Sequence, residues 1–194
     1  MSTEHTRLTD AISIALDRAR DLTSGFALVG YGILELRDPR GHLIEVQPFA
    51  NLITDAGDLY YAGKTIVGIA PANPAAPTAM SGMKLGTGVT AAAKSGAGGA
   101  LVTYLTASNV AFDATFPSTA NLGAGLGVNA VYKTTWGAGV ATNTAITEAV
   151  IVNDAATNAA TVAANTASRV VFAAVNKGAA DSLAITWNHK FLGA

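Results

Sequence analysis

The end of the chain carries the pattern that most restricts how this sequence can fold. Residues 182–191 alternate with the period of two of a β-strand that has one buried face, and only His189 interrupts the apolar face. The apolar positions are Leu183, Ile185, Trp187 and Phe191. A second apolar run occupies residues 169–175, and Asn176 and Gly178 in the connection are typical of a hairpin. The chain therefore ends in an antiparallel sheet, with Trp187 expected in its core.

Shorter runs that favour β-structure recur along the chain between clusters of Gly, Asn, Ser and Pro. Two of them flank residues 38–41, Asp-Pro-Arg-Gly, which suit a type I turn, and Pro48 either stops the second strand or places it at a sheet edge. The expected strands are residues 32–37, 42–47, 65–69, 83–85, 100–106, 110–116, 128–136, 145–152, 159–164, 169–175 and 182–191. This pattern predicts a mainly β chain, folded as an antiparallel β-sandwich or jelly-roll-like domain over residues 26–194.

Two helices are expected in the first third of the chain. Leu8, Ile12 and Leu16 recur at helical spacing on one apolar face, so residues 1–25 are predicted to form an amphipathic N-terminal arm. The arm can pack on its own domain or on a partner. Residues 51–57 offer caps for a second, shorter helix, although Gly57 disfavours it.

Composition excludes several classes of function. The chain has no cysteine, and therefore no disulfide framework, thiolate metal site or cysteine nucleophile. Its formal net charge of -1 argues against binding to nucleic-acid phosphates. No apolar run approaches the roughly 18 residues of a spanning helix, and the N-terminus lacks the pattern of a secretory signal. We expect a protein made in the cytoplasm that binds neither nucleic acid nor membrane.

The charged residues are unevenly distributed. Of the 25 Asp, Glu, Lys and Arg residues, 14 lie in the first 58 positions, which leaves 11 for the remaining 136 residues. A free monomer usually stays soluble with more surface charge than that. Two interpretations remain open: a simple Ala- and Thr-rich β-protein, or a subunit whose faces are covered by neighbouring subunits.

Two short stretches match phosphate-binding motifs only in part. Residues 86–91 have the G-x-G-x-x-A form of a dinucleotide fingerprint, but the glycines of residues 96–99 disfavour the helix that must follow. Residues 63–65 supply only the final Gly-Lys-Thr of a Walker loop. Neither match predicts a nucleotide site.

No arrangement of residues predicts catalysis or metal binding. His5, His42 and His189 are scattered without metal-ligand spacing, and His189 reads as a strand residue. Glu148 has no partner carboxylate nearby, so we interpret it as structural, accepting hydrogen bonds from a neighbouring loop. We therefore predict no enzyme activity, no cofactor, and no catalytic or metal-binding residue.

Exposed loops and the N-terminal arm are the remaining candidates for binding. The prolines of residues 71–77 exclude both a helix and a paired strand, so this loop should be exposed. The predicted interaction residues are Leu8, Ile12, Leu16, Pro71, Pro74 and Pro77. Tyrosine and tryptophan side chains could instead form a sugar-binding surface, although the parity of Trp187 favours the core.

Four segments, taken in order, resemble those of a group of tailed-bacteriophage virion proteins. They are residues 51–57 (NLITDAG), 83–88 (MKLGTG), 146–149 (ITEA), and 176–177 (NK) followed by 181–187 (DSLAITW). Val150 stands where such proteins often have glycine, so the local turn can differ.

The resemblance implies a non-enzymatic particle component attached to the head, tail or baseplate. We expect a capsid decoration or tail-associated subunit, present in the virion as a homo-oligomer and binding capsid or tail subunits. The alternative is a module of the particle that binds glycans on the host surface.

Overall fold

The computed structural model describes residues 27–65, 77–124 and 126–192. Its strands are β1 (Ala27–Arg37), β2 (Leu43–Ile53), β3 (Gly82–Gly86), β4 (Val110–Ala111), β5 (Ser118–Asn121), β6 (Val128–Trp136), β7 (Asn143–Val152), β8 (Thr166–Lys177) and β9 (Ser182–Leu192). One α-helix, α2 (Asp55–Thr65), and two 3₁₀ turns, η1 (Gly96–Gly99) and η2 (Ala163–Asn165), complete the described elements. The predicted N-terminal arm, residues 1–25, lies outside them.

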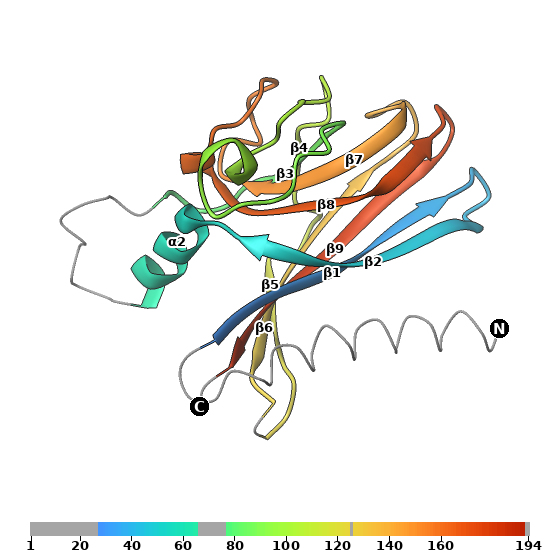
Figure 1. The fold of residues 1–194 in the computed structure, drawn as a ribbon. Helices are drawn as coiled ribbons and strands as arrows, with labels where there is room; N and C mark the ends of the chain where they lie inside the picture. The colour runs from blue at the N-terminus through green and yellow to red at the C-terminus, as the bar shows by residue number, and fades with distance from the viewer. Residues whose placement is uncertain (1–26, 66–76, 125, 193–194) are drawn as a thin grey trace.

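The nine strands form one curled antiparallel sheet in the order β4-β3-β7-β8-β2-β1-β9-β6-β5 (Figure 1). This confirms the prediction of a mainly β, antiparallel fold. We expected two stacked sheets, as in a sandwich or jelly roll, whereas the described strands are continuous. The continuity depends on two residue pairs between β2 and β8, Leu52 with Arg169 and Ile53 with Ser168.

The curl brings strands from opposite ends of the sheet together. Asp113, two residues after edge strand β4, donates its backbone N–H to the carbonyl of Lys133 on β6 (2.9 Å). Its carboxylate accepts hydrogen bonds from the backbone N–H and the hydroxyl of Thr135 (2.9 and 2.8 Å). The sheet therefore wraps around a single interior.

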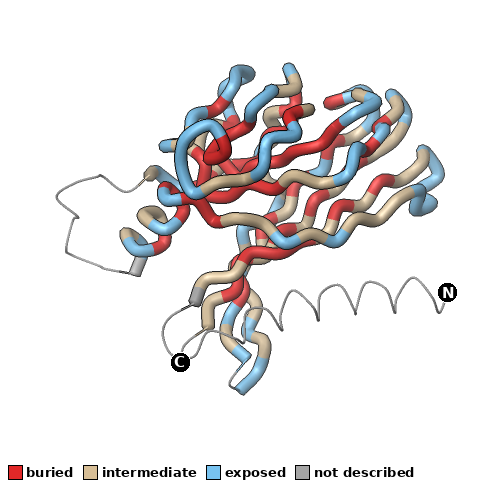
Figure 2. Tube along the Cα trace, in the orientation of Figure 1, coloured by how far each residue is buried: buried red, intermediate tan, exposed pale blue. Residues whose placement is uncertain are grey.

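Two tryptophans occupy the centre of this interior. Trp136 and Trp187 are both fully buried, so the prediction of Trp187 as a core residue is confirmed. Figure 2 shows buried and half-buried segments alternating along the long strands of the sheet. Phe49 packs its ring edge against Trp187, with centroids 5.1 Å apart. Gly32, opposite Trp187 on β1, leaves room for this contact, because a Cβ there would lie 2.5 Å from the Phe49 ring.

The first hairpin confirms the predicted turn at residues 38–41. The backbone N–H of Gly41 donates to the carbonyl of Asp38 (2.9 Å), and the Asp38 carboxylate accepts the N–H groups of Arg40 and His42. Pro48 does not stop the second strand, because it lies within β2 opposite Ile33. β8 pairs with β2 only beyond this point, so Pro48 stands on an unpaired edge, the other alternative.

Helix α2 confirms the second predicted helix. Thr54 caps its start, since the Thr54 hydroxyl accepts the backbone N–H of Gly57 (3.1 Å). Gly57 lets the helix approach β8 closely, because a Cβ there would lie 2.1 Å from the carbonyl oxygen of Ala167. The strand expected at residues 65–69 is wrong at Thr65, which ends α2, and its other residues lie outside the described part of the chain.

Strands were wrongly predicted at residues 159–164 and, apart from an isolated bridge at Tyr104, at residues 100–106; residues 110–116 contribute only the short β4. The first two segments form loops that cover the outer face of β7, opposite the main core. Leu101 packs there with Val150, Val152 and Ala155 in a small second cluster of buried apolar residues. Val102 and Val162, two other β-favouring residues of these segments, are exposed and do not pair as strands.

Candidate interaction surface

Buried charged side chains lie on the outer face of β3, β7 and β8. The strand register places Lys84 opposite Val150, and Val150 opposite Arg169, so the three residues cross the sheet side by side. All three side chains are fully buried. A buried charge is costly unless it is paired and hydrogen-bonded, so the partners of Lys84 and Arg169 determine what this face does.

Arg169 pairs with Glu148 beneath the loop of residues 87–104. Its Nε and Nη2 atoms donate to Glu148 Oε2 at 3.1 and 2.7 Å, and neither side chain is exposed. Two of the three remaining guanidinium hydrogens donate to the carbonyl oxygens of Thr90 (2.8 Å) and Gly98 (3.1 Å). One side chain thus ties two distant points of the loop to β8.

Glu148 holds the same loop through its other oxygen. Oε1 accepts the backbone N–H groups of Gly88 (2.9 Å), Val102 (3.1 Å) and Thr103 (2.9 Å). This confirms the interpretation of Glu148 as a structural acceptor for a neighbouring loop. It also explains the partial dinucleotide motif at residues 86–91, since the N–H of Gly88 is directed at a protein carboxylate. Gly63 to Thr65, the partial Walker motif, lie inside α2.

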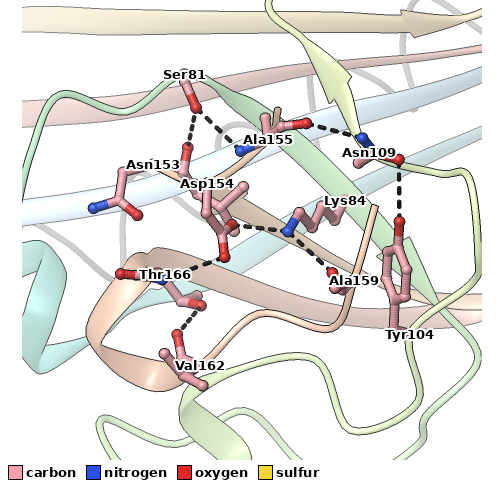
Figure 3. Close-up of polar contacts among 12 residues, drawn as sticks. Ser81, Lys84, Tyr104, Asn109, Asn153, Asp154, Ala155, Ala159, Val162 and Thr166 are labelled. Atoms are coloured by element: carbon pink, nitrogen blue, oxygen red, sulfur yellow. Dashed lines mark hydrogen bonds and ion pairs between the residues drawn. The ribbon is translucent and has the colours of Figure 1, made fainter. Parts of the chain in front are cut away.

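Lys84 anchors a second loop, residues 153–162, in the same way (Figure 3). Its Nζ lies 2.9 Å from the Asp154 carboxylate and donates to the carbonyl of Ala159 (3.1 Å). Tyr104 joins the two loops, because its hydroxyl donates to the Asn158 side chain (2.8 Å). Partial burial raises the pKa of Tyr104, which keeps this donor protonated at neutral pH.

The two anchored segments, residues 87–107 and 153–164, form what we call the loop platform. They contain 18 exposed residues, of which only Lys94 is charged, and its ammonium pairs with the Asp58 carboxylate. Three valines are the most exposed large apolar residues of the platform: Val89 (76 %), Val102 (44 %) and Val162 (58 %). The platform is therefore a neutral, partly apolar surface held on a charged, buried base.

A second buried polar cluster lies at the end of the core that α2 covers. The Tyr61 hydroxyl bonds to the Tyr132 hydroxyl (2.8 Å) and to Nδ1 of His189. Burial lowers the pKa of His189 to about 3 and raises the pKa of Tyr132 to about 12, so all three groups are neutral at pH 7. His189 lies on strand β9, as predicted. Its bond to the Tyr61 hydroxyl attaches α2 to the sheet.

We expect the stability of the protein to fall below pH 6.5 because of His189. An unfolded histidine binds its proton near pH 6.5, whereas folded His189 does so only at about 3, so unfolding takes up a proton between these values. The free energy of unfolding should decrease by up to about 1.4 kcal/mol per pH unit across this window. Denaturant titrations at pH 7.5 and pH 5.0 measure the loss. His42→Gln, which removes an exposed imidazole, should keep it, and an equal loss in His189→Gln would contradict the assignment.

Of the six predicted interaction residues, the structure describes only Pro77. Leu8, Ile12, Leu16, Pro71 and Pro74 lie outside the described residues, and Pro77 is half-buried just before β3. Sequence reasoning missed the loop platform. Its lack of charge and its Ala, Gly and Thr content were visible signals, but the residues that hold it, Arg169 and Lys84, come from distant strands.

The described part of the chain also bears on sugar-binding, metal-binding and membrane-spanning features. Both tryptophans are buried, which removes them from a sugar-binding surface. No group of three His, Cys, Asp or Glu residues in the described segments could hold a metal ion. No helix within those segments is long and apolar enough to cross a membrane. Comparisons with protein families, curated proteins and solved structures find no match to this chain.

Proposed function

We propose that the protein is a non-enzymatic structural subunit of a tailed-bacteriophage virion. In this role it decorates the capsid or belongs to the tail, and it binds neighbouring virion subunits. The mechanism is surface complementarity, in which exposed neutral loops bury area on a neighbour and so stabilise the particle. The low surface charge of the chain after residue 58 is the observation that carries this proposal.

The structure sharpens the observation about charge. Of the 11 charged residues after position 58, five are buried: Lys84, Glu148, Arg169, Lys177 and Lys190. Only Lys64 and Lys94 are exposed, and the other four are half-buried. The surface of this part of the chain is therefore even less charged than its composition, as expected for a subunit covered by neighbours.

Two of the four segments that carry the bacteriophage resemblance meet in space. Residues 83–88 and 146–149 lie on paired strands, with Gly86 opposite Glu148, and Gly88 donates to the same carboxylate. A Cβ on either glycine would lie 2.5 Å from Glu148 Oε1. The two motifs thus form one structural unit, which supports reading them together instead of as separate chance matches.

Purified particles test the proposal. We expect the protein to sediment with intact particles of the phage that encodes it and to form discrete density on the head, tail or baseplate in electron microscopy. The control is the same lysate from a phage that lacks the gene. Recovery of the protein only in the soluble fraction, with none on the particles, would contradict the proposed function.

A further inference from the structure

We infer that the loop platform is the surface through which two copies of this chain associate. The inference deepens the proposed function, on which it rests, by naming the surface and the partner. It combines three features of residues 87–107 and 153–164: their area, their lack of charge and the way in which they are anchored.

The size of the platform fits a protein interface. Standard interfaces involve about 20–30 residues from each partner. The platform has 18 exposed residues and a further eight that are half-buried, which together reach this size. The two loops are joined through Tyr104, whose hydroxyl donates to Asn158, and Asn158 also accepts the backbone N–H of Ala107 (2.8 Å).

The charge of the platform suits a second copy of the same surface. A two-fold interface places a patch against itself, so a patch with charges of one sign repels its own copy. Lys94 is the single exposed charge of the platform, and Asp58 neutralises it. The platform therefore meets its own copy without charge repulsion.

The anchoring of the loops lowers the cost of association. Loops that become ordered on binding lose conformational entropy, which weakens the complex. Here Glu148 fixes the backbone at Gly88, Val102 and Thr103. Arg169 fixes Gly98, and Lys84 fixes Ala159, so both loops are ordered before a partner arrives. The exposed Val89, Val102 and Val162 then supply the apolar area that becomes buried.

The composition of the platform also sets the expected strength of the contact. Its exposed residues include no Trp, Tyr or Arg, the residue types that dominate binding energy in tight complexes. A single pair of platforms should therefore associate weakly, with a dissociation constant on the order of 10–1,000 μM. Repetition of such contacts in a particle makes the assembly stable through multivalency.

Sedimentation velocity of the purified full chain tests the inference. From about 10 μM to about 1 mM, the wild-type protein should shift from monomer to dimer or a larger oligomer. Val89→Glu and Val162→Glu each place two carboxylates at the self-contact and should weaken association at least tenfold. Ile44→Glu, on the β1–β2 hairpin and 54 % exposed in the wild type, is the matched control and should associate like the wild type.

Thermal unfolding of each variant verifies that it is folded. If either Val89→Glu or Val162→Glu does not fold, the other variant still tests the inference. A wild-type protein that stays monomeric at about 1 mM would overturn the inference. Unchanged association of folded Val89→Glu and Val162→Glu would overturn it as well. Loss of particle binding in these variants, with the wild type monomeric, would assign the platform to another subunit. None of these results contradicts the proposed function, because that proposal is tested by whether the protein is found on particles.

Discussion

Replacing Arg169 with methionine should lower the free energy of unfolding by about 3–5 kcal/mol, because it leaves the Glu148 carboxylate buried without its partner. It also removes the hydrogen bonds that the Arg169 guanidinium donates to the carbonyl oxygens of Thr90 and Gly98. Denaturant titration measures the loss. Trypsin cleavage after Lys94 should become faster, because the loop that carries Lys94 loses its attachment to β8.

The matched control is Arg37→Met, which breaks an ion pair of the same chemistry on the surface. Arg37 lies 2.7 Å from Glu35, but both side chains are substantially exposed, so a cost below about 1 kcal/mol is expected. The double variant Glu148→Gln/Arg169→Met should cost less than the sum of the single variants by about 0.5–3 kcal/mol. A cost for Arg169→Met as small as that for Arg37→Met would contradict the anchoring role.

Replacing Trp187 with alanine should lower the free energy of unfolding by about 3–5 kcal/mol. The change removes a fully buried indole and leaves a cavity beside Phe49. Trp187→Phe should cost less, since the indole N–H of Trp187 has no acceptor among the described residues and no hydrogen bond is lost. Denaturant titration at pH 7.5 compares the two variants.

Trp136 provides the control for the hydrogen-bond contribution. It is equally buried, but its indole N–H donates to the carbonyl of Ser108 (2.7 Å). Trp136→Phe should therefore cost about 1 kcal/mol more than Trp187→Phe. Equal costs for the two phenylalanine variants would mean that the indole hydrogen bond of Trp136 contributes nothing to stability.

The alternation of apolar and polar residues was enough to predict the strands that bury one face. β6 and β9 alternate over most of their length, so inward residues such as Trp136 and Trp187 share the parity of their apolar neighbours. The turn at residues 38–41 and the cap at Thr54 follow from the hydrogen bonds that Asp and Thr make with nearby backbone groups. Glu148 could be assigned a structural role because no second acid stood near it in the sequence.

The loop platform could not be predicted, since the groups that form it lie far apart in the sequence. The segments 100–106 and 159–164 have the composition of strands, and only the tertiary structure decides that their backbone groups bond to Glu148 and Lys84. The same holds for the curl of the sheet, which brings Asp113 within hydrogen-bond distance of Lys133 on β6.

The sequence by itself determined a charge-poor, mainly β chain with Trp187 in its core, because composition and period-two alternation are properties of neighbouring residues. Only the tertiary structure decided that the nine strands form one curled sheet and that buried charges hold two neutral loops on its outer face. Strand order and ion pairs between distant strands depend on which chain segments meet. Local residue preferences do not specify those meetings.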